Sequence, residues 1–209
     1  MNNTQQLPPI LDFDESSNKG TLFDNRDGQS YPVVKIGNQI WIAENFRYLP
    51  SIKDNGDLYE NSMIPDNEYL EKGYGRLYDW NTAMNIAPEG WKLPSDKDFQ
   101  ELISFITKDN NLIRDNDKEL EIYLRAMFAW EDNNCNDKYG FSVKPAGSFI
   151  TISHEFLEVG KCAYLWSRNY YSTWALYRSV TDLYKFRNST FVSNRDFEFS
   201  VRLILDLSV

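Results

Sequence analysis

The alternation of hydrophobic and polar positions is clearest near the two ends of the chain. Residues 31–36 (YPVVKI) and residues 39–45 (QIWIAEN) are two β-type runs separated by Gly37-Asn38. A Gly-Asn pair between two such runs fits the two-residue turn of a β-hairpin. The pattern therefore predicts an antiparallel hairpin over residues 31–45.

The last stretch, residues 197–205, alternates along its whole length. Glu198, Ser200 and Arg202 occupy every second position, which predicts a strand with one polar, solvent-facing side. The intervening apolar positions, predicted to face the core, are Phe197, Phe199, Val201, Leu203 and Leu205.

A helical period replaces this alternation in the middle of the chain. Ser95 followed by Asp98 resembles a capping box with Asp in place of Glu, and so predicts a helix start. Residues 77–87 predict a short helix, and residues 117–130 predict a second long one. The apolar stripe of the first long helix comprises Phe99, Leu102, Ile103 and Ile106, and that of the second comprises Leu120, Leu124, Met127 and Phe128.

Strands first, helices in the middle and short β-type runs after residue 131 favour an α+β fold with antiparallel sheets. Residues 1–20 are polar and interrupted by Pro, which predicts a flexible N-terminal lead-in. Residues 49–75 lack a sustained period and predict a long surface loop. A chain of 209 residues is then expected to form a single domain over residues 21–209.

Charge narrows the classes of partner. The chain carries 22 basic and 31 acidic residues, a net charge of -9, and no cluster of Lys and Arg. Binding to phosphate backbones or anionic membranes depends on such clusters, so we expect no nucleic-acid partner. No apolar run approaches the ~20 residues of a membrane span, so direct membrane insertion is not expected either.

Groups for catalysis are few in this sequence. His154 is the only histidine, which removes a multi-histidine zinc site and leaves little for a Ser-His-Asp or Cys-His constellation. Cys135 and Cys162 are 27 positions apart and are consistent with one disulfide or with two free thiols. We therefore predict no catalytic residues.

One acidic stretch raises the question of calcium. Residues 131–137 offer side-chain oxygens of the kind that a hard cation accepts, but their spacing does not fit an EF-hand loop. A solvated turn is the preferred interpretation, calcium is the alternative, and no other cofactor is expected. The oxygen donors are Glu131, Asp132, Asn133, Asn134, Asn136 and Asp137.

The region from residue 164 to residue 191 is rich in aromatic residues, with arginines between them. Tyr, Trp and Arg bury much surface for little lost side-chain entropy and dominate binding hot spots. Some of these rings, Trp166 among them, are expected in the core. The candidate ligand-binding residues are Arg168, Tyr170, Tyr171, Trp174, Tyr177, Arg178, Asp182, Tyr184 and Arg187.

Six blocks in order resemble the Fibrobacter succinogenes major paralogous domain family, over roughly residues 22–206. They are DNRDGQSYPVVKIGNQIWIAENF, GYGRLYDWNTAM, APEGWKLPSDKDFQEL, YGFSVKPAGSF, YLWSRNYY and FSVRLI.

The resemblance implies a C-type-lectin-like fold, with two main helices packed on small antiparallel sheets and long loops. It also implies a relation to the formylglycine-generating sulfatase-modifying enzymes, whose C-terminal cysteines carry copper and oxygen chemistry. In this chain Leu203 follows Arg202, where family members often have Cys, and Leu cannot act as a nucleophile or a metal ligand. The resemblance therefore favours a scaffold without catalysis.

We accordingly expect a non-catalytic ligand-binding domain, of adhesin or receptor-binding type, that binds a protein or glycan on another cell or particle. The segment 168–196 resembles the variable region of proteins diversified by retroelements. The alternatives are a structural or assembly subunit of a surface or phage-like particle, and an oxidoreductase that uses Cys135 or Cys162. The family implies a secreted or cell-surface location with a trimmed signal; a cytoplasmic or phage-associated location is the alternative.

Overall fold

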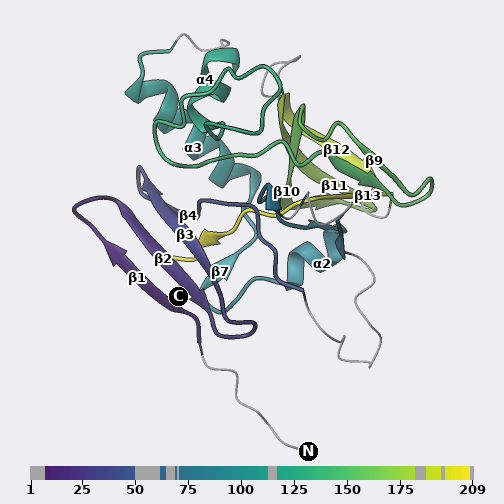
Figure 1. Ribbon diagram of the computed structural model, residues 1–209, viewed down its shortest axis with the longest axis horizontal. Coiled ribbons are helices and arrows are strands. Elements are labelled where there is room, and N and C mark those ends of the chain that lie inside the picture. Colours follow the sequence, from purple (N-terminus) through teal and green to yellow (C-terminus); the bar gives the residue numbers. More distant parts are fainter. Residues whose placement is uncertain are drawn as a thin grey trace, which may run out of the picture.

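The computed structural model describes residues 8–49, 62–64, 69, 71–112, 117–181, 187–193 and 196–207. Two β-sheets dominate it, with three helices beside them (Figure 1). The first sheet is antiparallel throughout, in the order β1-β2-β3-β4-β14-β7. Its strands are β1 (Ile10–Asp14), β2 (Lys19–Asp24), β3 (Gln29–Ile36), β4 (Gln39–Ile42), β14 (Ile204–Leu205) and β7 (Trp91–Lys92).

The second sheet follows the order β12-β11-β10-β13-β6-β5, with β8 pairing β13 and β9 pairing β8. Its longest element is the β10–β11 hairpin, and the pairing of β10 with β13 is parallel. Its strands are β5 (Ser62–Met63), β6 (Leu77–Tyr78), β8 (Ser148–Ile150), β9 (Glu155–Leu157), β10 (Cys162–Tyr171), β11 (Trp174–Thr181), β12 (Arg187–Ser193) and β13 (Phe197–Ser200).

The helices among the described residues are α2 (Trp80–Asn85), α3 (Asp96–Asp109) and α4 (Asp117–Leu124). The predicted start of α3 is confirmed. The Ser95 side chain accepts from the backbone N–H of Asp98, and the Asp98 carboxylate accepts from the backbone N–H of Ser95. Both donors would otherwise lack partners at a helix N-terminus.

The expected fold class is wrong. The α+β arrangement of a C-type-lectin-like fold, with two main helices packed on small antiparallel sheets, does not describe a chain with 38% strand and 17% helix. A curled six-stranded sheet and a second large sheet form the framework instead. The predicted hairpin over residues 31–45 is present as β3 and β4, joined at Gly37-Asn38.

The second predicted helix is shorter than its apolar period indicated. It ends at Leu124, because the backbone of Ala126 then bonds to Val143, and Val143 in turn bonds to Leu124. Met127 and Phe128, predicted to face the core, lie at the surface. Tertiary backbone pairing thus overrides the local helical pattern.

The expected boundary between a lead-in of residues 1–20 and a domain of residues 21–209 falls inside strand β2. Residues 10–14 form β1 and pair along their whole length with β2, which itself begins at Lys19. Ordered structure therefore begins well before residue 21. Residues 1–7 lie outside the described part of the chain.

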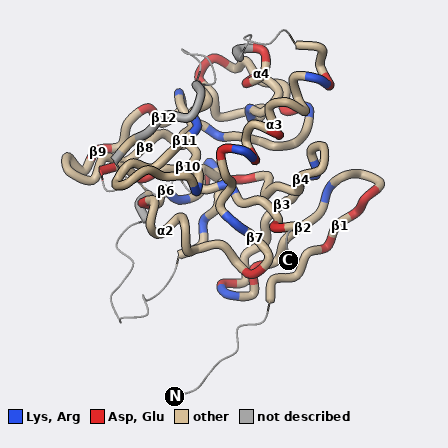
Figure 2. Tube along the Cα trace, turned by 180° about the vertical axis from the view of Figure 1, so that it is seen from behind, with Lys and Arg blue, Asp and Glu red and all other residues tan. Residues whose placement is uncertain are grey.

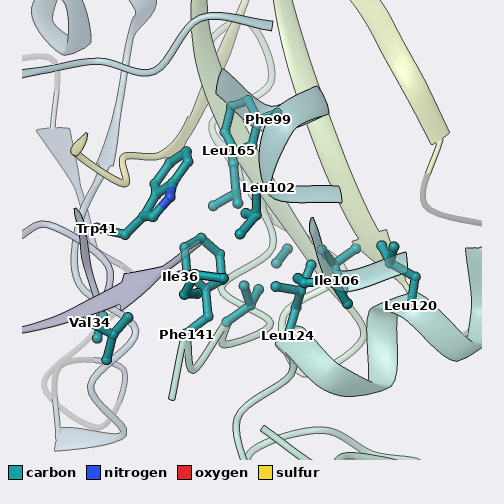
Figure 3. Packing of buried hydrophobic residues seen from close by; sticks show 14 of the residues in the cluster. Val34, Ile36, Trp41, Phe99, Leu102, Ile106, Leu120, Leu124, Phe141 and Leu165 are labelled. Atoms are coloured by element: carbon teal, nitrogen blue, oxygen red, sulfur yellow. The ribbon is translucent and has the colours of Figure 1, made fainter. Parts of the chain in front are cut away.

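One core cluster fills the space between the first sheet and the helices α3 and α4 (Figure 3). Trp41 of β4 is its centre, with ring centroids 5.5 Å from Phe99 of α3 and 5.4 Å from Phe141. Each large apolar side chain buried in this way contributes about 1.5–3 kcal/mol of hydrophobic stabilisation. A second cluster, around Trp166 and Phe199, packs against α2.

The polar side predicted for residues 197–205 does not face solvent. Glu198, Ser200 and Arg202 are all buried, because β13 has partners on both sides and the chain then crosses into the first sheet as β14. The guanidinium of Arg202 donates to the side-chain oxygen of Asn45 and to three backbone carbonyls, of Ile42, Phe141 and Ser142. Burial lowers the pKa of Arg202 to about 9.

Candidate functional site

The two faces of the β10–β11 hairpin pack on different helices. Leu165 lies opposite Arg178 and points toward the α3 cluster, whereas Trp166 lies opposite Tyr177 and belongs to the α2 cluster. This alternation follows from the period of two along a strand. The hairpin is therefore held from both sides along its base.

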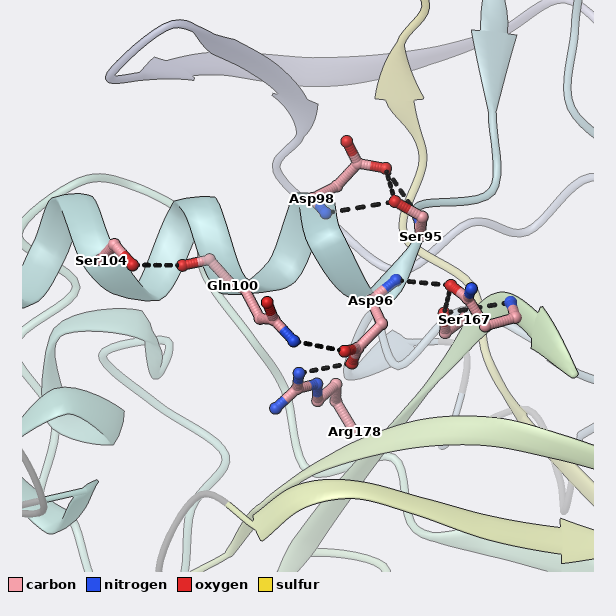
Figure 4. A network of polar contacts seen from close by, with 8 residues as sticks. Ser95, Asp96, Asp98, Gln100, Ser104, Ser167 and Arg178 are labelled. Carbon is pink, nitrogen blue, oxygen red and sulfur yellow. Dashed lines mark hydrogen bonds and ion pairs between the residues drawn. The ribbon is translucent and has the colours of Figure 1, made fainter.

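Arg178 fixes the α3 side of this base. Its guanidinium forms an ion pair with Asp96 in the first turn of α3 (Figure 4). Arg178 as a whole is only 2% exposed. The backbone N–H of Asp96 also donates to the side chain of Asn169, over 2.7 Å. Arg178, predicted as a ligand-binding residue, thus joins the hairpin to α3.

Helix α2 fixes the other side. It begins after Asp79, whose carboxylate caps the helix by accepting from the backbone N–H of Thr82. The indole N–H of Trp80 donates to the carbonyl of Ser167, and the ring of Trp80 lies 5.0 Å from that of Tyr170. Trp80 thus supports both the strand and an aromatic ring at its end.

The tip of the hairpin carries exposed rings. Tyr170, Tyr171 and Trp174 are 61%, 76% and 51% exposed. Tyr171 lies directly opposite Trp174, which places these two rings on the face that α3 packs against further down the hairpin. Tyr170, opposite Ala175, lies on the α2 face. We call Arg168, Tyr170, Tyr171 and Trp174 the tip surface.

A hollow of about 280 Å³ adjoins the tip surface and is called the side hollow here. Its walls are Met84, Asn85 and Ala87 in and after α2, residues 91–93, and Arg168. Met84 is four positions after Trp80, so both lie on one face of α2. The side hollow therefore uses the same face of α2 as the contact between Trp80 and Tyr170. The backbone N–H of Arg168 is fixed by a 2.8 Å bond to the carbonyl of Pro94.

Tyr177, another predicted binding residue, does not join this surface. The ring of Tyr177 is partly buried, with its centroid 4.9 Å from that of Phe199 and 5.7 Å from that of Tyr164. Arg187 begins β12, with its backbone paired to Ser179. Asp182 and Tyr184 lie outside the described residues.

A comparison with protein-family models matches residues 34–204 to the Fibrobacter succinogenes major domain. The chain belongs to this family. The match includes the whole of the β10–β11 hairpin, α2 and the side hollow, and it begins within β3. No curated protein and no solved structure matches the chain.

In this Fibrobacter succinogenes major domain, sequence reasoning missed the contribution of α2 and β7 to the surface. Trp80 and Met84 lie within the short helix predicted over residues 77–87, and Trp91 lies just before the predicted helix start at Ser95. Only the three-dimensional structure brings them beside Arg168. The available signal was the presence of Trp80 and Trp91 on two short elements close in sequence. A tryptophan in such a position is equally typical of the core.

Neither cysteine forms a disulfide bond to a described residue, and the two have different surroundings. Cys162 is buried at the start of β10, and Cys135 lies partly exposed in a loop. His154 occupies an exposed turn with its ring centroid 6.0 Å from that of Phe149. Neither cysteine belongs to the tip surface or the side hollow.

Two carboxylates in the acidic stretch of residues 131–137 accept hydrogen bonds from other groups of the protein. The Asp132 carboxylate accepts from Arg125, and the Asp137 carboxylate accepts from the backbone N–H and the hydroxyl of Ser142. Burial raises the pKa of the Asp137 carboxyl. Within the described ranges, no three His, Cys, Asp or Glu side chains converge as metal ligands would, and no helix is long and apolar enough to cross a membrane.

Proposed function

We propose that this domain is a non-catalytic ligand-binding module, of adhesin or receptor-binding type, and that the tip surface contacts the ligand. The observation that carries the proposal is the exposure of three large rings at the end of one hairpin. Clustered exposed aromatic side chains are unusual on a soluble surface and typical of binding sites.

The rigidity of the hairpin base supports this proposal. Trp80, Arg178 and Asn169 hold the hairpin to α2 and α3 immediately below the exposed rings. A surface fixed before binding loses less conformational entropy when the ligand arrives. The tip surface therefore suits specific recognition better than a free loop of the same composition would.

The same arrangement limits which positions could vary without loss of the fold. Residues 168–174 are exposed, whereas Ala175, Leu176 and residues 178–181 are buried. Diversification of the segment 168–196 stays a prediction. If it occurs, we expect it at positions 168–174 and not in the buried part of β11.

The proposal is tested with the purified chain on a panel of immobilised glycans and displayed peptides, and on bacterial cells. The double variant Tyr171→Ser/Trp174→Ser removes two exposed rings that do not support the core. We expect this variant to lose binding to every target that the native chain binds, with its unfolding free energy unchanged within about 0.5 kcal/mol.

Two outcomes would count against the proposal. Undiminished binding by the double variant would show that the ligand contacts another surface. A stable oligomer of the native chain that the double variant dissociates, measured by light scattering, would instead assign the tip surface to assembly of a particle.

A further inference from the structure

The side hollow differs in charge from the rest of the molecule. The chain has a net charge of -9, and acidic positions are spread along its trace (Figure 2). The residues that line the side hollow include Lys92 and Arg168, and none of those described is Asp or Glu. A concave site with an uncompensated cation and no acid in its wall attracts an anionic group.

Two hydrogen-bond donors of residues in this wall have no partner within the described part of the chain. Lys92 is paired with Asp206 over 2.8 Å, but the guanidinium of Arg168 has no ion pair or hydrogen bond to any described residue. Trp91 also lines the side hollow, and its indole N–H has no hydrogen bond to a described residue. Both groups donate and neither accepts, so a ligand must bring acceptor oxygens.

The size and the surroundings of the side hollow limit what carries those oxygens. A volume of about 280 Å³ lies just below the range of about 300–1,000 Å³ for small-molecule sites, and it suits one sugar ring or a similar small group. Apolar surface from Met84, Ala87 and Leu93 lines the hollow beside the donors. The exposed ring of Tyr170, two residues after Arg168 and packed on Trp80 of α2, offers a flat face to a neighbouring sugar residue.

We propose, on the basis of the proposed function, that the side hollow binds a sugar residue bearing a carboxylate, as the terminal unit of an acidic glycan. The guanidinium of Arg168 pairs with the carboxylate, a geometry in which Arg forms two parallel hydrogen bonds. The Trp91 indole N–H donates to a ring or hydroxyl oxygen. The tip surface then contacts the sugar units that follow.

The test uses the six tryptophan indole signals of the ¹⁵N-labelled full chain, with the Trp91 signal assigned from the variant Trp91→Phe. Three probes are titrated separately: glucuronate, the neutral methyl glucoside, and N-acetylglycine, which has a carboxylate but no sugar ring. We expect a saturable shift of the Trp91 signal with glucuronate, and affinities at least about tenfold weaker for the other two probes.

The variant Arg168→Gln should weaken glucuronate binding by at least about tenfold, because the charge-assisted bonds are lost. Its matched control, Lys108→Gln, removes one positive charge at the far end of α3 and should bind glucuronate as the native chain does. If methyl glucoside shifted the Trp91 signal as strongly as glucuronate does, the claim that the site recognises the carboxylate charge would be overturned. If N-acetylglycine shifted the Trp91 signal as strongly as glucuronate does, the claim that the site recognises a sugar ring would be overturned.

Failure of this inference is distinguishable from failure of the proposed function. No Trp91 shift with any of the three probes would overturn the inference about the side hollow. The proposed function is judged separately, by whether the Tyr171→Ser/Trp174→Ser variant loses binding on the panel, since neither ring lines the side hollow.

Discussion

The indole N–H of Trp80 on α2 donates a hydrogen bond to the carbonyl oxygen of Ser167 on β10, 2.8 Å away. Ser167 directly precedes Arg168, so this bond ties the helix to the strand where the tip surface begins. The same indole ring lies against Tyr170. One buried side chain therefore fixes both a strand and an exposed ring above it.

Replacing Trp80 with Phe should retain most of the ring packing and remove the N–H donor. The Ser167 carbonyl would then be left without its partner in a buried position, which costs about 1–3 kcal/mol. Urea unfolding should show this loss. Trp174→Phe, at the exposed tip, should change stability by no more than about 0.5 kcal/mol. Equal effects of the two changes would contradict the assigned role of Trp80.

Tyr171 and Tyr177 lie on the same hairpin but should respond differently to truncation. Tyr177→Ala removes a ring packed on Phe199 and Tyr164, and we expect a loss of about 2–3 kcal/mol. Tyr171→Ala removes an exposed ring and should leave the melting temperature nearly unchanged. Thermal unfolding by circular dichroism measures both. A large loss for Tyr171→Ala would mean that its ring supports the fold.

Arg202→Met should be among the most destabilising single changes in the chain. It removes the guanidinium that donates to the buried carbonyls of Ile42 and Phe141 and to the partly buried carbonyl of Ser142, and each buried group left without a partner costs about 1–3 kcal/mol. We expect a loss of more than about 3 kcal/mol, or failure to accumulate as soluble protein. Arg168→Met, at the surface, is the control and should unfold like the native chain.

The carboxyl of Asp109 should titrate below its ordinary value. Hydrogen bonds from Lys138 and then from Tyr139 lower the pKa of Asp109 in the folded state. A lowered folded pKa means that the carboxylate's contribution to stability is present above the unfolded pKa and is lost as pH falls through the folded pKa. NMR titration should show the shift, and Lys138→Met should raise the pKa again. An unchanged value in Lys138→Met would refute the assigned cause.

The sequence predicted correctly those features of the fold that depend on interactions between neighbouring residues. The capping residues Ser95 and Asp98 marked the start of α3, and the Gly37-Asn38 turn marked the β3–β4 hairpin, because both depend on neighbours within a few residues. The overall architecture depends on pairings between distant strands, such as β14 with β4 and β7, which no local pattern specifies. The balance of sheet over helix was therefore mispredicted.

The candidate surface was anticipated only in part, for a related reason. Composition alone pointed to the segment that contains Tyr170, Tyr171 and Trp174, and their exposure follows from the position of the hairpin end. It could not separate these rings from Tyr177 and Arg178, since burial depends on α2 and α3 packing against opposite faces of the same hairpin. The contributions of Trp91 and Met84 required the folded structure.

The strand β1 is the outermost strand of the first sheet among the described residues, so one row of its backbone N–H and C=O groups meets water. Its outward side chains include Asp12 and Asp14, with Glu15 next along the chain. A second molecule that docked here edge to edge would bring its own carboxylates against them. Self-repulsion at this border therefore opposes the growth of continuous intermolecular sheets in a protein this rich in strands.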